Sequence, residues 1–294
     1  VVILHALCHP ATAMEKKQHG QRKFLRLLLL HRFLSGIIKS HRYLIVPADA
    51  EAPEDVPADI TVITQPEDIY LASSSAMDLF SCIDGLDNIL ATSTPESSWE
   101  LPEIAQAMAD EDILYAGKYS SPDIELLMSG GCDAAIENTM IYHSPKIIEQ
   151  IEKCGIPVLV ERSSYESHPL GRMEWVRLYG LIIGRSDEAE QFFSEKSALL
   201  DDVISRESTG QTAAFFYISS NGYAVVRKPG DYISKMIGLA GGEYILSAES
   251  LNVDENALST ANIQFEAFYA LAKDADYLIY NGTIDGGVET LAQL

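Results

Sequence analysis

The sequence predicts an α/β protein with two doubly wound lobes, joined by one long rigid helix and separated by a cleft. Short apolar runs alternate with amphipathic helical segments from residue 43 onward, as in layered α/β domains. The run 186–208 contains no glycine or proline and is long enough to lead from one lobe to another. A length of 294 residues is that of about two domains.

Charge divides the chain near residue 42. Residues 1–42 contain eight of the 21 Lys and Arg but only one of the 43 Asp and Glu, and the rest of the chain is strongly acidic. We therefore expect an atypical basic segment at 1–41, a first lobe at 42–185, a connecting helix at 186–208 and a second lobe at 209–294. The net charge of −22 argues against nucleic acid as a partner, because phosphate binding needs a basic face.

The basic segment has features of a signal peptide, since an apolar run follows several cationic residues at 16–38. Arg26, His31 and Arg32 interrupt that run, no small-residue cleavage site follows it, and "HALC" before Cys8 is a poor lipid-attachment motif. The alternatives are a basic amphipathic helix or an aberrant start to the chain, and the abrupt change of composition favours the second. No run of about 18 apolar residues exists, so no membrane span is predicted.

The first lobe alternates strands and helices. Residues 42–47 and 60–64 are predicted strands, and 68–93 predicts strand, turn, helix and strand. Segment 112–138 predicts a strand ending at Gly117, a helix from Ser121–Pro122 and a strand at 134–138.

Segment 142–161 is the clearest unit of that lobe. Ser144 and Pro145 open a helix, Gly155 ends it, and "IPVLV" is a continuously apolar strand of the kind that a parallel sheet buries on both faces. Beyond it, helices are predicted at 170–184 and 186–208, a strand at 212–220, a turn, strand and helix over 221–246, and a helix and strand over 265–281.

Six stretches in this order resemble the extracytoplasmic substrate-binding proteins of ABC importers for ferric siderophores, haem and cobalamin. They are "IYLASSSAMDLFSCIDGLDNILATS", "GKYSSPDIELLMSGGCDAAI", "CGIPVLVE", "RLYGLIIGRSDEAEQF", "YISKMIGLAGGEYIL" and "AKDADYLIY". The resemblance covers residues 43–294 and implies two Rossmann-like lobes on one helical backbone, the class III periplasmic-binding-protein fold. Residues 1–41 match nothing in the family pattern. Family members also continue beyond the point matching Leu294, so the second lobe is expected to be incomplete.

The resemblance implies a function in transport. Such a protein captures a metal chelate in the interlobe cleft and delivers it to a permease and ATPase complex, with no cofactor and no catalysis. It acts in the periplasm or as a cell-surface lipoprotein, held at the membrane by its partner or a lipid anchor. The expected export signal is not recognisable in this chain.

Loops at the carboxyl ends of strands are expected to line the cleft. Tyrosines offer flat faces with a polar tip, arginines bind carboxylate or catecholate groups, and His143 and His168 are possible direct metal ligands. The stretch "ERSSYESHPLGRMEW" (161–175) begins with a loop that is longer and more charged than a plain connection between a strand and a helix. The plain alternative is an ordinary loop, with Arg172 paired locally to Glu166 or Glu174. The expected ligand-binding residues are Ser74, Tyr119, Tyr142, His143, Tyr165, His168, Arg172, Tyr223 and Arg227.

The resemblance also implies two permease-docking glutamates, Glu125 and Glu266, each at the start of a predicted helix. The plain alternative for each is a solvated first-turn glutamate favoured by the helix dipole. Other functions on the same fold are a chelatase-like enzyme and a non-transport chelate sensor. Against the enzyme, the sequence has no GxGxxG, GxxxxGK[ST], HExxH or GxSxG motif, and its four cysteines have no metal-ligand spacing.

Overall fold

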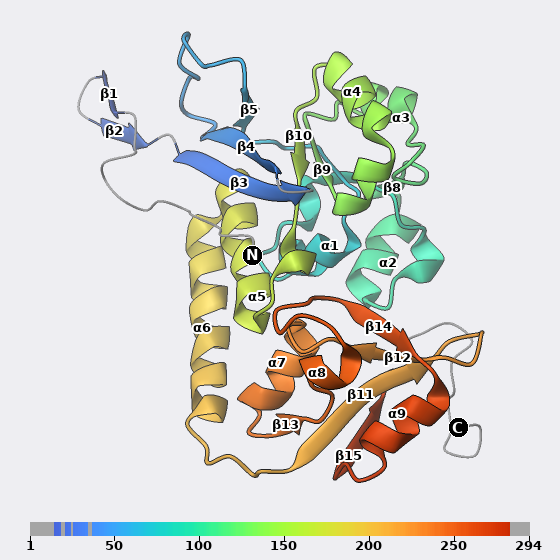
Figure 1. Ribbon diagram of the computed structural model, residues 1–294. Helices are drawn as coiled ribbons and strands as arrows, with labels where there is room; N and C mark the ends of the chain where they lie inside the picture. Colours follow the sequence, from blue (N-terminus) through green and yellow to red (C-terminus); the bar gives the residue numbers. More distant parts are fainter. Residues whose placement is uncertain (1–14, 19–20, 25, 35–36, 283–294) are drawn as a thin grey trace. The chain divides into compact units, whose positions relative to one another are not determined.

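The computed structural model describes residues 15–18, 21–24, 26–34 and 37–282. The chain divides into two compact units, each with its own sheet and helices (Figure 1). The first unit comprises Val1–Ser164 and Met173–Phe193, and the second comprises Tyr165–Arg172 and Ser194–Leu294. The divisions fall inside α5 (Pro169–Ile182) and α6 (Ser186–Ile204), so each of these helices contributes residues to both units.

The first unit contains a five-stranded sheet in the order β10-β9-β6-β7-β8, in which every pair is parallel. Parallel neighbours require crossover connections, and helices supply them here. Because all the strands run the same way, their carboxyl ends meet at one edge of the sheet. The strands are β6 (Ile69–Leu71), β7 (Ile89–Thr92), β8 (Leu114–Tyr115), β9 (Ala134–Glu137) and β10 (Val158–Val160).

Local sequence sets where the helices of this unit begin. Pro102 and Pro145 occupy the first turns of α2 (Pro102–Ala109) and α4 (Pro145–Lys153), where the missing N–H costs no hydrogen bond. The helix predicted from Ser121–Pro122 begins later, as α3 (Ile124–Ser129), because the Asp123 carboxylate accepts a hydrogen bond from Leu126 N at 3.0 Å. The strand predicted to end at Gly117 ends at Tyr115. The fourth crossover helix is α1 (Ser74–Ser81).

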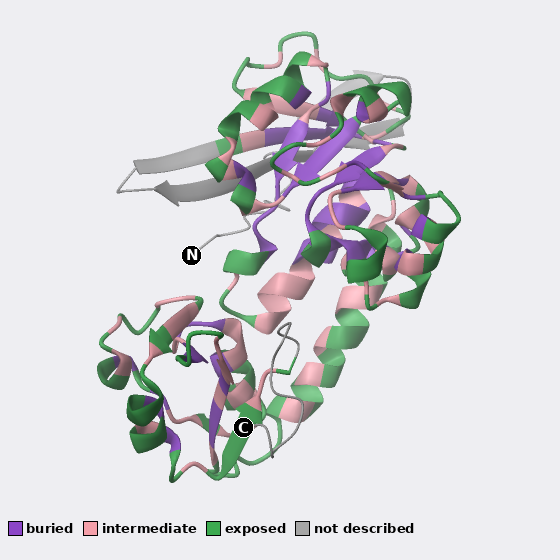
Figure 2. Cartoon of the chain, turned by 90° about the vertical axis from the view of Figure 1, so that its right-hand side faces the viewer, coloured by how far each residue is buried: buried purple, intermediate pink, exposed green. Residues whose placement is uncertain are grey.

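Buried side chains alternate between the two faces of this sheet. Ile69 and Leu71 point into the core layer that contains α1, α2 and α5, whereas Tyr70 and Ala72 point into the layer that contains α3 and α4. Figure 2 shows the strands as the most deeply buried part of this unit. The predicted burial of this sheet on both faces is therefore confirmed.

Before the parallel sheet, the described residues include five further strands. β3 (Arg26–Leu34) pairs antiparallel with β4 (Ile37–Val46), which pairs parallel with β5 (Ile60–Thr64). The predicted strands at 42–47 and 60–64 are confirmed, while the alternative of an amphipathic helix over 16–38 is wrong for the described residues. β1 (Glu15–Gln18) and β2 (Gln21–Phe24) form a separate antiparallel pair.

Helices α5 and α6 pack closely around Gly180 and Arg177. A Cβ atom on Gly180 would lie 2.5 Å from the Cβ of Ala189 and 2.6 Å from the carbonyl oxygen of Arg185, so only glycine fits there. Arg177 donates to both carboxylate oxygens of Glu190 at 2.7 Å, and its guanidinium carbon lies 3.9 Å from the ring centroid of Phe193. The predicted long helix is confirmed as α6, a single helix of 19 residues that ends at Ile204.

The second unit has a mixed sheet. A tight turn joins β11 (Thr212–Ile218) to β12 (Ala224–Arg227), which makes that pair antiparallel, and β14 (Thr260–Ile263) extends it. β13 (Glu243–Tyr244) and β15 (Tyr277–Tyr280) pair parallel with β11. The helices are α7 (Tyr232–Leu239), α8 (Ala248–Leu251) and α9 (Phe265–Ala272).

Candidate functional site

In the first unit, four predicted site residues follow carboxyl ends of parallel strands. Ser74 follows β6, Tyr119 follows β8, and Tyr142 and His143 follow β9. Ser74 and His143 are exposed, whereas Tyr119 and Tyr142 are partly buried against the core layer of α3 and α4. The topology therefore places all four along one edge of the sheet. The two tyrosines also pack against the hydrophobic core.

The first residues of the loop 161–169 are buried and structural. Glu161 is 1% exposed and accepts hydrogen bonds from Ser73 Oγ at 2.6 Å and from Ser163 N at 2.8 Å. Tyr179 also donates to this carboxylate, at 3.4 Å, and burial raises the pKa of the Tyr179 hydroxyl well above its usual value. The charged start of the loop thus joins β6, β10 and α5, and its exposed part begins at Ser164 and Tyr165.

In the second unit, three predicted residues lie near α7. The guanidinium carbon of Arg172 lies 3.6 Å from the ring centroid of Tyr232, and that of Arg227 lies 5.9 Å from the same centroid. His168 lies one helical turn before Arg172, and its carbonyl oxygen accepts from Arg172 N at 3.2 Å. Arg172 and Arg227 thus lie near Tyr232, and His168 lines a pocket together with Lys235 and Leu239 of α7.

Asp231 fixes the turn that presents Arg227. The Asp231 side chain is 5% exposed, accepts from Ile233 N at 3.1 Å and Ser259 N at 3.2 Å, and lies 3.7 Å from Arg227 Nη1. The Tyr244 hydroxyl donates to the Arg227 carbonyl oxygen at 2.7 Å. Burial raises the pKa of Tyr244, so this hydroxyl stays protonated and can donate.

Positive charge concentrates here within an acidic unit. The second unit contains seven Lys and Arg against 15 Asp and Glu. Four of those seven cations, Arg172, Arg227, Lys228 and Lys235, belong to α7, to the turn before it or to the arginine stacked on its first residue. Guanidinium groups at this place can bind an anionic guest, beside the carboxylates of Asp231, Glu243 and Glu255.

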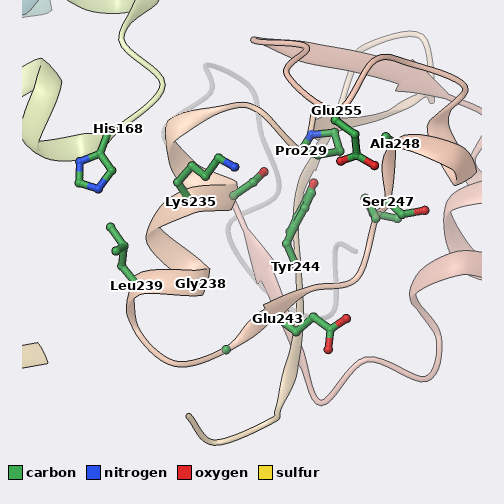
Figure 3. A pocket seen from close by; sticks show the side chains of 13 residues that line it. His168, Pro229, Lys235, Gly238, Leu239, Glu243, Tyr244, Ser247, Ala248 and Glu255 are labelled. Carbon is green, nitrogen blue, oxygen red and sulfur yellow. The ribbon is translucent and has the colours of Figure 1, made fainter. Parts of the chain in front are cut away.

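A pocket of about 520 Å³ lies beside α7 within the second unit (Figure 3). Figure 3 shows His168 and Leu239 on one side, Lys235 on α7 next to them, and Tyr244 and Glu255 across the hollow. Its wall thus combines an imidazole, an ammonium, carboxylates and apolar surface. A volume of this size suits a small organic ligand or part of a larger one.

The remaining predicted residues lie apart from this group. Tyr223 is 38% exposed at the opposite end of β12 from Arg227, and Tyr165 is 44% exposed. Glu125 and Glu266 are exposed in the first turns of α3 and α9, and their docking role remains a prediction.

Metal coordination by protein side chains alone has no support in the described residues, where no three His, Cys, Asp or Glu side chains form a cluster able to hold an ion. His143 and His168 as direct metal ligands remain predictions. The search for helices long and apolar enough to cross a membrane, made over the described part of the chain, found none.

Sequence reasoning missed Tyr232, Lys235 and Glu137. Tyr232 and Lys235 follow the turn "RKPGD" (227–231) at helical spacing, a pattern that is equally typical of any solvent-exposed helix start. Glu137 ends the apolar strand β9 and is fully buried, with both carboxylate oxygens lacking a hydrogen-bond partner among the described residues. Burial raises its pKa to about 8, so the carboxyl is largely neutral at pH 7.

No family model matches the sequence. An uncharacterised lipoprotein of Methanocaldococcus jannaschii is 27% identical over 186 residues, which is 60% of this chain. The matched region is 42% of that lipoprotein, so the chain spans about two fifths of the length of this curated relative.

Solved structures match over most of the chain. A periplasmic binding protein of Veillonella parvula is 17% identical with a TM-score of 0.61, covering 86% of this chain and 76% of that one. The periplasmic haem-binding protein HutB of Vibrio cholerae is 16% identical with a TM-score of 0.59, covering 73% and 76%. The petrobactin-binding protein YclQ of Bacillus subtilis is 16% identical with a TM-score of 0.59, covering 79% and 77%.

These likenesses confirm the fold predicted from the sequence. At identities of 16% and 17% the comparisons establish the fold. The ligand and the partner have to be argued from the residues of the site. The chain has the α/β fold of the periplasmic binding proteins.

Proposed function

We propose that the protein is an extracytoplasmic solute-binding protein that captures an anionic metal chelate and delivers it to the permease and ATPase of an ABC importer. The anionic candidates are ferric siderophores and haem; cobalamin, which is neutral overall, is the third member of the predicted set. The role is binding and release, with no covalent step. The lipoprotein relative supports a location outside the cytoplasm.

The observation that carries this proposal is the cationic group around α7. Arg172 and Arg227 face one aromatic ring in a unit whose overall charge is negative, and His168 and Lys235 line the pocket beside it. Catecholates, carboxylates and propionates are matched by such guanidinium groups. The fold supports the same function, because HutB binds haem and YclQ binds petrobactin on it.

The other predicted residues have proposed roles in the same function. Tyrosine faces and small polar groups would contact the body of the chelate, and Glu125 and Glu266 would pair with basic pockets of the permease. The proposed contacts to the chelate body are Ser74, Tyr119, Tyr142, His143, Tyr165 and Tyr223.

Native mass spectrometry of protein purified from rich medium, followed by calorimetric titration, tests the proposal. The probes are a ferric tris-catecholate siderophore, haemin and cyanocobalamin. Wild type is expected to bind at least one anionic probe, and the Arg172→Ala, Arg227→Ala double variant to bind it at least about tenfold more weakly. Arg206→Ala is the matched control, since Arg206 is exposed in the same unit and pairs with Asp202.

Two outcomes would overturn the proposal. Binding of a simple sugar or amino acid, with none of the three probes bound, would show that the ligand class is wrong. Metal insertion into a tetrapyrrole by the purified protein would establish the chelatase-like alternative in place of a transport receptor.

A further inference from the structure

Glu161 is a buried carboxylate that accepts hydrogen bonds from three separate segments of the first unit. It is 1% exposed, and its Oε1 accepts from Ser73 Oγ at 2.6 Å and from Ser75 Oγ at 3.3 Å. Its Oε2 accepts from Ser163 N at 2.8 Å and from the Tyr179 hydroxyl at 3.4 Å. A carboxylate removed from water is stable only where hydrogen bonds replace its hydration. These four donors therefore hold the turn after β6, the loop after β10 and α5 at one point.

Ser73 is turned away from the role that its position favours. It is the N-cap residue of α1, where a serine hydroxyl commonly accepts a hydrogen bond from an amide of the first helical turn. Here the side chain makes no such bond, because its hydroxyl is buried and donates to Glu161. The Ser75 hydroxyl lies 3.1 Å from that of Ser73 and also donates to Glu161. Glu161 thus sets the direction of the hydroxyls on both sides of Ser74.

Ser74 is the serine of this turn whose hydroxyl stays available. It is exposed, and in the part of the chain that the structure describes its hydroxyl has no hydrogen-bond partner. It follows the carboxyl end of β6, at the edge of the sheet where open α/β folds bind their ligands. A hydroxyl there can donate to an oxygen of a chelate or accept from a donor group, and its position depends on the backbone that Glu161 holds.

We infer that Glu161 is a positioning residue, which holds the turn 73–75 so that the Ser74 hydroxyl is in place to contact the chelate. This inference rests on the proposed function and adds to it the buried group that fixes one of the proposed contacts. Glu161 does not touch the guest and acts through Ser74. A contact that is held in place before binding loses less conformational entropy when the guest arrives, so loosening the turn should weaken binding.

A double-mutant cycle of Glu161→Gln and Ser74→Ala, measured by calorimetric titration, tests this role. The probes are a ferric tris-catecholate and haemin, and the cycle uses the one that wild type binds more tightly. Glu161→Gln keeps the shape but has one acceptor oxygen in place of two, and it is expected to bind the probe about tenfold more weakly than wild type. In the Ser74→Ala background the same change is expected to alter the affinity less than about twofold, because the contact through which it acts is gone.

The charge of Glu161 cannot imitate this result. Loss of one negative charge would by itself strengthen the binding of an anion, so a weakening reports position. Glu100→Gln, at an exposed residue of the same unit, is the matched control and should leave the affinity unchanged. Circular dichroism checks that each variant folds. If Glu161→Gln does not fold, Ser73→Ala replaces it, since that change removes the donor at 2.6 Å and is expected to show the same dependence on Ser74.

The outcomes separate this inference from the proposed function. If wild type binds a probe and Glu161→Gln binds it equally well or more tightly, the inference fails and the proposed function stands. An equal weakening by Glu161→Gln with and without the Ser74 hydroxyl would assign Glu161 a purely structural role and would also overturn the inference. Wild type that binds neither probe would remove the proposed function, and the inference with it.

Discussion

Replacing Glu137 by glutamine is expected to change how the stability of the first unit depends on pH. Burial raises the pKa of Glu137 from its ordinary 4.5 to about 8, so the folded protein binds this proton more tightly than the unfolded chain does. The contribution of Glu137 to the free energy of unfolding is therefore at its full size below pH 4.5. It is lost progressively as the pH rises toward 8, because the unfolded chain gives up the proton first.

The size of the effect follows from that pKa difference. Each pH unit between the unfolded and folded pKa values costs about 1.4 kcal/mol, which gives a total of roughly 5 kcal/mol across the interval. Glu137→Gln keeps the shape and cannot ionise. Relative to wild type, the variant should therefore gain about 1.4 kcal/mol in free energy of unfolding for each pH unit between about pH 5 and pH 8.

Tryptophan fluorescence during urea denaturation measures this difference. Trp99 and Trp175 are the two tryptophans of the chain, and both lie in the first unit, so the signal reports the unit that contains Glu137. Glu100→Gln, an exposed residue of the same unit, controls for the loss of one negative charge. A free-energy difference between Glu137→Gln and wild type that stays constant from pH 5 to pH 8 would refute the reasoning.

Three further predictions concern packing, capping and docking. Gly180→Ala should lower the free energy of unfolding of the first unit by about 1–3 kcal/mol in urea denaturation, because the new Cβ would overlap Ala189. In the control Gly238→Ala in α7, the new Cβ meets no atom within 4 Å, so stability should stay unchanged or rise. Asp231→Ala should lower the thermal stability of the second unit by about 1–3 kcal/mol, and Asp231→Asn should recover part of that loss by keeping the cap. Glu125→Lys and Glu266→Lys should reduce uptake by liposomes containing the partner importer without changing chelate affinity; an equal fall in affinity would contradict the docking role.

Much of the fold could be predicted because its signals are local. Pro145 before an apolar stripe and the continuous strand "IPVLV" define α4 and β10 within a few residues, and the uninterrupted run from Ser186 defines α6. The short elements β13 and α8 were missed, because two to four residues carry no clear period. The start of α3 was placed too early, since proline alone does not show that Asp123 is the cap.

The site was less predictable because its contacts are between distant segments. Glu161 looked like part of an exposed charged loop, yet Ser73 and Tyr179 satisfy it in the core. Arg172 and Arg227 were selected as cations near strand ends and helix starts, and their binding role remains a prediction. Their proximity to Tyr232 joins segments of the second unit that are far apart in the sequence, 165–172 and 227–232, which no local pattern reveals.

The central claim is that the cationic group around Tyr232 binds the chelate. Anomalous diffraction at the iron edge, from crystals grown with a ferric tris-catecholate, locates the metal without reference to any fold comparison. The account predicts an iron peak beside the guanidinium groups of Arg172 and Arg227, with catecholate oxygens in contact with both. Iron bound elsewhere in the molecule, with both arginines touching only protein, would contradict it.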